Sequence, residues 1–429
     1  MNLPSARHHP HLVIALLPCL LATAVAVAQQ PATPEQPIPI TAADHRAGFK
    51  PFDDEVTAFM RARSIPGGAL AVSRNDKLVL ARGYGWADRD AAEPVSPTSL
   101  FRIASISKPI TAVAVLRLIE QSGGRVTLDT PAIPLLEMAP YLAPGTMPDP
   151  RLQRVTIRQL LQHTAGFDAG ASFDPMFRPL SIAREMGLEP PAGPEAIVRY
   201  MLGRPPDFDP GAKHVYSNFG YCILGRVIEK LSGTTYEDYV QRKVLVPLGI
   251  RDMRIGRTLP QYRAPGEVRY YDPRTDENVM TPADGDRVPI PYGGFHLEAM
   301  DAHGGWIASA PDLVRFACAF DDPQHCPILT PESIAAMFAR PEGEAGYEAD
   351  GTPQAAHYGL GWSVRPVDDR ANHWHAGRLS GSSSLLVRRH DGLNWAVLFN
   401  QSRDESGLSY DDIDPALHRA ANAVKDWPP

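Results

Sequence analysis

The chain has 429 residues, 44% hydrophobic and 21% charged, which is an ordinary globular composition with enough length for a sizeable core. Its formal net charge is −7, so it lacks the basic field that a nucleic-acid-binding protein needs. We therefore expect no nucleic-acid partner. One large domain or two intergrown domains would fit this length.

The N-terminal residues have the pattern of a secretory signal peptide. Arg7 and three histidines precede an apolar run from Leu12 to Val27, which ends in the small residues Ala26-Val27-Ala28. We expect cleavage of residues 1–28 after Ala28, and a secreted or periplasmic protein. An uncleaved anchor is the alternative, but the run is short for a membrane span, and no other stretch is apolar enough to cross a membrane.

Residues 29–46 are rich in proline and glutamine and predict an extended linker, followed by a folded domain at residues 47–425. Apolar residues at helical spacing predict helices at Phe52–Arg63, Thr156–His163, Pro194–Met201, Phe219–Leu231, Tyr236–Val246, Ala310–Phe320, Pro331–Phe338 and Asp414–Val424. Strand patterns bounded by turns occur at Ala69–Val72, Leu78–Tyr84, Tyr358–Arg365, Ser383–Arg389 and Asn394–Asn400. This order predicts one sheet built from both termini, with a mostly helical lobe inserted at roughly residues 125–300.

One long segment, from Arg257 to Met300, is rich in loops. It carries Tyr270, Tyr271, Tyr292 and Phe295 among prolines and glycines. Such a segment could wall a cleft, and an apolar wall would suit acyl esters.

Three cysteines remain after the leader. In an oxidising compartment Cys318 and Cys326 could pair across a short loop, leaving Cys222 as a small buried hydrophobe. Their spacing makes a poor zinc site. His373 and His375 could supply half of a metal site, but no matching carboxylate motif accompanies them, and we expect no metal or other cofactor.

The stretch from Phe101 to Ile119 is the first that looks built for chemistry. It holds Ser105 and Lys108 at the start of an apolar run dense enough for a buried helix. Residues three apart share a helix face, so the lysine can reach the serine hydroxyl. A buried lysine that loses its proton near neutrality could then activate the alcohol as a nucleophile. The alternative is a serine N-cap beside a solvated lysine.

Two further segments could complete a site around Ser105. Tyr216 and Asn218 precede a predicted helix, and they offer a phenol for proton transfer and an amide that could hold the lysine. The second segment, His375-Ala376-Gly377, lies on or beside a strand. Its glycine would let a substrate approach the backbone closely, and the next backbone amide could point into the site.

These three segments, in this order, resemble the serine β-lactamase and penicillin-binding-protein superfamily. They fit its class C-like, β-lactamase-related branch, near the family VIII esterases and the D-stereospecific peptidases. The resemblance covers roughly Phe52 to Val424 and includes flanking stretches such as Leu160–Gly166 and Tyr358–Trp362. It implies an α/β (α+β) fold, in which an antiparallel sheet is flanked by helices and a helical lobe is inserted, with the site between them.

The resemblance also implies roles for individual residues. Ser105 would be the acylated nucleophile, and Lys108 and Tyr216 would handle the protons. Which of the two is the base stays open, because a coupled pair titrates as a unit.

The remaining positions would bind substrate. Asn218 would contact its ester or amide, and His375 and Gly377 would occupy the third motif. The backbone N–H groups of Ser105 and Arg378 would form an oxyanion hole.

His375 stands where the lactamases of this superfamily usually have lysine. A largely neutral imidazole is a weaker partner for the carboxylate of a β-lactam. We therefore expect a secreted esterase or D-amino-acid peptidase or amidase, acting on a small ester, amide or short peptide through an acyl-enzyme. The alternatives are a class C-like β-lactamase, or a non-catalytic protein that recognises penicillin or cell-wall peptides.

Overall fold

The computed structural model describes residues 37–42, 47–282 and 285–428. The predicted signal peptide and most of the predicted linker lie outside these residues. From Ile38 onward the chain groups into one compact unit. No helix of the described residues combines the length and the apolar character needed to cross a bilayer.

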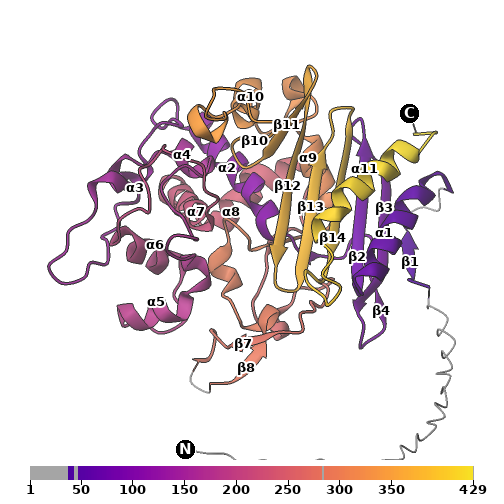
Figure 1. Cartoon of the computed structure of the whole chain (residues 1–429), viewed down its shortest axis with the longest axis horizontal. Coiled ribbons are helices and arrows are strands. Elements are labelled where there is room, and N and C mark those ends of the chain that lie inside the picture. Colours follow the sequence, from indigo (N-terminus) through magenta and orange to yellow (C-terminus); the bar gives the residue numbers. More distant parts are fainter. Residues whose placement is uncertain (1–36, 43–46, 283–284, 429) are drawn as a thin grey trace, which may run out of the picture. The chain divides into compact units, whose positions relative to one another are not determined.

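The two ends of the chain together build an antiparallel sheet, as predicted (Figure 1). Its strands lie in the order β1 (Ile40–Ala42), β3 (Lys77–Asp88), β2 (Gly67–Arg74), β14 (Leu393–Phe399), β13 (Ser382–Arg388), β12 (Arg370–Leu379), β11 (Ser363–Val367) and β10 (His357–Tyr358), and β4 (Glu93–Pro94) pairs with β3. The N-terminal hairpin joins the C-terminal strands where Gly68 of β2 pairs with Phe399 of β14.

Helices cover both faces of this sheet, because its central strands bury both of their faces. On one face, α1 (Lys50–Ala62) and α11 (Ile413–Ala423) pack over large side chains such as Trp395 and Val397. On the other face, the small side chains of Ala69 and Ala71 join the larger core that contains α9 (Ala310–Cys318) and α2 (Ser107–Gln121).

The inserted lobe is mostly helical, as predicted, and it surrounds α2. Its helices are α3 (Ala132–Leu136), α4 (Ile157–Leu161), α5 (Pro179–Met186), α6 (Pro194–Leu202), α7 (Asn218–Ser232) and α8 (Tyr236–Val240). A capping box between Thr156 and Gln159 starts α4. Helix α2 is buried from Ser107 to Leu116, and α7 packs beside it, so the start of α2 lies where the sheet and the lobe meet.

Short strands connect the remaining segments. A small sheet of β5 (Phe101–Arg102), β9 (Trp306–Ala308) and β6 (Arg254–Ile255) lies next to the start of α2, and β7 (Thr275–Glu277) pairs with β8 (Arg287–Pro289). Helix α10 (Pro331–Phe338) has the predicted bounds.

Three expectations differ from the structure. Ile40–Ala42, predicted as linker, is strand β1, and Thr41 is anchored by a hydrogen bond to the Val95 carbonyl. The predicted strand Tyr358–Arg365 is split into β10 and β11 by a turn at Gly361, whose φ is +81°. The possible disulfide is absent from the described residues: Cys318 and Cys326 are free, and the Cys318 sulfur faces Ser73 instead.

The aromatic residues of the Arg257–Met300 segment enclose a buried arginine. Arg102 is 1% exposed, and its guanidinium carbon lies 4.3 Å from the Tyr270 ring centroid, with Tyr292 and Phe295 farther out. Its guanidinium donates to the Pro291 carbonyl at 2.6 Å, as a buried cation requires. Within the described chain, these aromatic rings border another hollow or the core, and they do not line the one at Ser105.

Candidate active site

Ser105 lies in a single 3₁₀ turn, Ala104–Ile106, directly before α2. The preceding Ala104 has φ +48°, in the left-handed region that non-glycine residues seldom adopt. Flanking hydrogen bonds hold this turn: the Ile103 N–H donates to the Trp306 carbonyl at 3.0 Å, and the Ile103 carbonyl accepts from the Ser384 hydroxyl at 2.8 Å. The structure therefore presents Ser105 at the N-terminal end of α2, as the sequence predicts.

Lys108 is fully buried one turn later. Its Nζ lies 3.2 Å from Ser105 Oγ, 2.7 Å from Asn218 Oδ1 and 3.1 Å from the His303 carbonyl oxygen. Burial disfavours the charged form and lowers the pKa of Lys108 to about 7, while the charge of Asp174 acts in the opposite direction. A substantial share of Lys108 is thus neutral at neutral pH and can accept a proton from Ser105.

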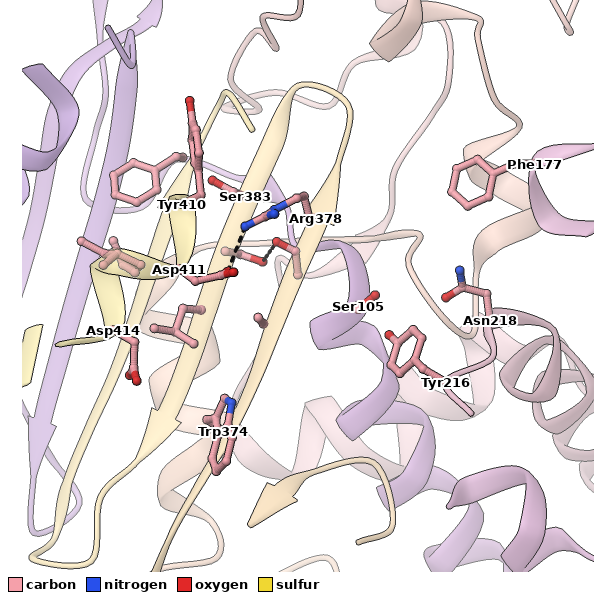
Figure 2. A pocket seen from close by; sticks show the side chains of 17 residues that line it. Ser105, Phe177, Tyr216, Asn218, Trp374, Arg378, Ser383, Tyr410, Asp411 and Asp414 are labelled. Carbon is pink, nitrogen blue, oxygen red and sulfur yellow. Dashed lines mark hydrogen bonds and ion pairs between the residues drawn. The ribbon is translucent and has the colours of Figure 1, made fainter. Parts of the chain in front are cut away.

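Tyr216 completes a group of three side chains around the serine. Its ring centroid lies 4.6 Å from Lys108 Nζ, and its phenol is close enough to Ser105 for the serine side chain to lower its pKa against burial (Figure 2). The residue is 40% exposed, yet desolvation by the surrounding protein raises the pKa of the phenol above its ordinary value. Tyr216 is therefore protonated at neutral pH.

The segment that carries Tyr216 is fixed by a buried histidine. The Ser217 N–H donates to His163 Nδ1 at 3.1 Å, and the His163 and Tyr216 ring centroids lie 4.4 Å apart. Burial, then the charge of Lys108, lowers the pKa of His163 well below its ordinary value. His163 therefore acts as a neutral acceptor beneath the site.

Asp174 is a site residue that our sequence reasoning missed. Its carboxylate accepts from Asn218 Nδ2 at 2.7 Å and from the Met176 N–H at 3.0 Å, so it fixes the orientation of the amide that faces Lys108. Asp174 precedes Pro175, which is a recognisable helix-start pattern. Nothing in that pattern indicates a partner 44 residues away.

His375 lies near this group but not in the wall of the hollow. It is 5% exposed, its Nε2 lies 2.9 Å from the Tyr358 hydroxyl, and its Nδ1 lies 2.7 Å from the Ala376 carbonyl oxygen. Nδ1 must therefore carry the proton, and Nε2 accepts from Tyr358. Desolvation, followed by the charge of Lys108, lowers the pKa of His375 to about 3, so the ring is neutral at physiological pH.

Gly377 allows β12 to lie against the serine turn. A Cβ at this position would be 2.2 Å from the Ile103 carbonyl oxygen and 2.3 Å from Ser384 Oγ. The close neighbour is therefore the protein's own backbone, whereas the sequence interpretation assigned that closeness to a substrate. Beyond Trp374, β12 has no partner in β11, so the edge from His375 to Leu379 is open on that side.

A hollow of about 490 Å³ connects these residues. Ser105, Tyr216 and Asn218 border it on one side, and it continues across Arg378 of β12 to the start of α11 at Asp411 and Asp414 (Figure 2). The structure thus brings Ser105, Lys108, Tyr216 and Asn218 into contact and places Gly377 and Arg378 beside them, while His375 stands behind Tyr216.

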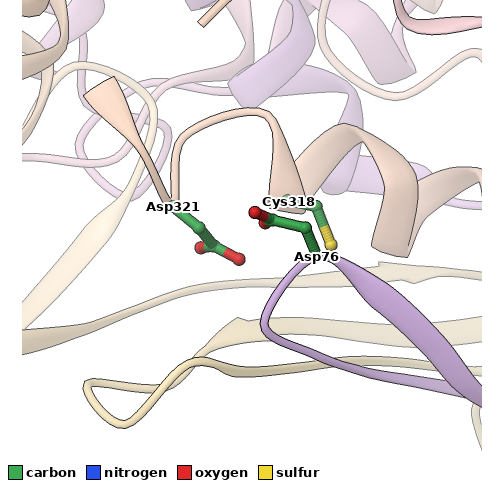
Figure 3. A group of neighbouring side chains, drawn as sticks. All are labelled: Asp76, Cys318 and Asp321. Carbon is green, nitrogen blue, oxygen red and sulfur yellow. The ribbon is translucent and has the colours of Figure 1, made fainter. Parts of the chain in front are cut away.

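One cluster of side chains outside this site contains residue types that can bind metal ions. Ligand atoms of Asp76, Cys318 and Asp321 lie within 4.8 Å of one another (Figure 3). Asp321, however, already accepts from the Arg388 guanidinium at 2.9 Å and from Asn394 Nδ2 at 2.6 Å. Burial and the charge of Asp321 raise the pKa of Asp76. The arrangement is that of a carboxylate pair balanced by an arginine, and it gives no support for a metal.

The two histidines of the possible half-site have other partners. His373 Nδ1 lies 3.3 Å from the Arg388 guanidinium, and burial lowers the pKa of His373 to about 2. His375 is engaged by Tyr358 as described above. His373 Nδ1 and both ring nitrogens of His375 therefore have partners within the protein.

An antiparallel sheet joined to a helical lobe, with a Ser-x-x-Lys pair at their junction whose lysine is buried, defines a serine hydrolase of the β-lactamase and penicillin-binding-protein superfamily. The Beta-lactamase family model matches residues 52–419, and the chain belongs to this family.

Several relatives agree with this assignment. The chain is 32% identical to Esterase EstB of Burkholderia gladioli over 368 residues, covering 80% of this chain and 87% of that protein. It is 28% identical to Penicillin-binding protein 4 of Amycolatopsis lactamdurans, covering 83% and 85% of the two chains. The D-amino acid amidase structure from Ochrobactrum anthropi SV3 shares the fold at 23% identity, with a TM-score of 0.63 and coverage of 88% and 97%.

Proposed function

We propose that the protein is an esterase or a D-amino-acid amidase or peptidase that acts through an acyl-enzyme on Ser105. One observation carries this proposal: Lys108 Nζ lies 3.2 Å from Ser105 Oγ and has a pKa of about 7. A buried amine in this state can activate an alcohol at neutral pH. The similarity to Esterase EstB, and the fold shared with a D-amino acid amidase, support these substrate classes.

In the proposed mechanism, neutral Lys108 takes the proton of the Ser105 hydroxyl as the oxygen attacks the substrate carbonyl. The backbone N–H groups of Ser105 and Arg378 stabilise the resulting oxyanion. Tyr216, which is protonated in the resting enzyme, donates its proton to the leaving alcohol or amine and regains one from Lys108. Water then attacks the acyl-enzyme with the same proton transfers in reverse order, which frees the acid and Ser105.

The state of His375 disfavours the β-lactamase alternative. A neutral, buried imidazole bonded to Tyr358 offers no charge to the carboxylate of a β-lactam. The non-catalytic alternative is disfavoured because the serine, lysine and tyrosine are all present and in contact. We also propose export of the protein, on the signal-peptide pattern of residues 1–28 alone.

A turnover panel tests the proposal. Short p-nitrophenyl esters, a D-alanyl amide and a chromogenic cephalosporin would be compared, with Ser105→Ala as the control. We expect ester or D-amide turnover that Ser105→Ala abolishes, and a transient mass increase on the peptide that contains Ser105. Turnover that survives in Ser105→Ala, or efficient cephalosporin hydrolysis with neither ester nor amide turnover, would contradict the proposal.

A further inference from the structure

A second hollow, of about 430 Å³, adjoins the first at Phe177 and Arg378, which border both. Three arginines from separate parts of the chain line it: Arg274 before β7, Arg378 on β12 and Arg403 after β14. Its other lining residues are neutral, and two of them carry hydroxyl groups. The hollow lies at the Ser380 end of β12, on the opposite side of Gly377 from His375.

The orientation of Arg274 is fixed by neighbouring side chains. Its guanidinium donates to both carboxylate oxygens of Asp272, at 3.0 and 2.8 Å, and to Ser380 Oγ at 3.0 Å. The Asp272 side chain is 1% exposed, so this support comes from below the surface. Ser380 Oγ accepts from the arginine, and the Ser380 side chain also helps to lower the pKa of Asp272.

The positive charges here outnumber the negative ones. Arg378 is paired with Asp411 at 2.9 Å, and Arg274 with Asp272. Arg403 is exposed and forms no ion pair or hydrogen bond with any described residue. Asp404 and Glu405, which follow it, do not line this hollow; they border the neighbouring hollow at Tyr271, which Arg403 also lines. One unpaired guanidinium and the remaining N–H groups of the other two thus converge on the same space.

Guanidinium groups bind carboxylates through paired, charge-assisted hydrogen bonds. We propose that this hollow is a subsite for a carboxylate, and that the preferred substrates are small esters or amides that carry one. The inference rests on the proposed function, because the reacting bond must lie at Ser105. The open edge of β12 leads from Gly377 beside the serine to the arginines, so one substrate can reach both.

Matched pairs of substrates test this. The p-nitrophenyl esters of glutarate and glutaramate differ only in the charge at the acyl end. The butyrate esters of 4-hydroxybenzoate and 4-hydroxybenzamide place the same difference on the alcohol. We expect kcat/KM to favour the anion about threefold or more in one of the two pairs, and this ratio to fall as salt is added.

Single variants locate the effect. Arg403→Gln and Arg274→Gln should each lower the anion-to-neutral ratio about threefold, while Arg125→Gln, beyond the far end of α2, should leave it unchanged. A ratio near one in both pairs for the wild-type protein, or a preference that Arg403→Gln does not reduce, would overturn the subsite.

A binding measurement separates this inference from the proposed function. Glutarate should bind the Ser105→Ala variant more tightly than glutaramide, its neutral diamide. Adding Arg403→Gln to that variant should weaken the binding of glutarate about threefold. Ser105-dependent turnover of the neutral esters without such binding would sustain the proposed function and reject the subsite. Binding of glutarate without turnover of any substrate would support the carboxylate subsite and reject the proposed function.

Discussion

The side-chain amide of Asn218 donates to the carboxylate of Asp174 at 2.7 Å, and this contact decides which end of the amide faces Lys108. With Nδ2 held by Asp174, Oδ1 accepts from Lys108, also at 2.7 Å. The carboxylate thereby acts on the lysine both through the amide and through its charge, which raises the pKa of Lys108 against the effect of burial.

Asp174→Asn should therefore change catalysis in two ways. The weaker hold on Asn218 should lower kcat about tenfold for a neutral ester, because the lysine loses a fixed partner. Loss of the negative charge should lower the pKa of Lys108 and move the acidic limb of the pH profile to lower pH. Measurement of kcat at pH 5–9 checks both. Asp129→Asn, in an exposed pair with Arg158, is the control, and an unshifted limb would mean that Asp174 has only a structural role.

The low pKa of Lys108 should make both activity and stability depend on pH. Because the neutral amine is the active form, kcat/KM should rise with pH through about 7 and then level off. The unfolded lysine has a pKa of about 10.4, so between pH 7 and pH 10 the unfolded state binds more protons and stability rises with pH. Denaturant unfolding at pH 7 and pH 9 measures this. In Lys108→Met the same increase should be missing, and its persistence would assign it to another group.

His375 should contribute nothing to the pH profile between pH 5 and pH 8, because its pKa is about 3. His375→Gln can still accept from Tyr358, and we expect the midpoint of the acidic limb to stay near 7, with a stability loss of about 1 kcal/mol. A limb that disappears in this variant would show that the histidine titrates there, contrary to its buried position.

Gly377→Ala should damage the site without touching its functional groups. The added Cβ would meet the Ile103 carbonyl and Ser384 Oγ, and β12 or the serine turn must move. We expect kcat/KM to fall more than tenfold and stability to fall by about 1–3 kcal/mol. Gly193→Ala is a suitable control, because a Cβ there meets no atom within 4 Å. Equal activity in both variants would show that the turn tolerates displacement.

The parts of the site that could be predicted are those set by local geometry. Ser105 and Lys108 are three residues apart on one helical surface, and that spacing alone brings their side chains within reach. Most helices and strands were predictable for the same reason, because apolar residues recur every 3.6 residues in a helix and every 2 residues in a strand. The two segments that supply Tyr216 and His375 could be placed only through the resemblance to a family.

What could not be predicted depends on contacts between distant segments. Asp174 meets Asn218 across a loop without periodicity, and Gly377 is required by the backbone of Ile103, which is remote in sequence. The aromatic residues after Arg257 were expected to wall a cleft that suits acyl esters. Most of them instead pack around the buried guanidinium of Arg102. No local sequence pattern indicates that Arg102 has these partners.

The pairing of β2 with β14 has a consequence for how the protein folds. These strands lie side by side in the sheet, yet roughly 300 residues of chain separate them, so the loop that must close is among the longest that this protein can form. During synthesis the edge of β2 that pairs with β14 stays unpaired until β14 has been synthesised. The order of assembly therefore makes the sheet a late event, and loss of the final strands would leave an aggregation-prone edge on the remainder.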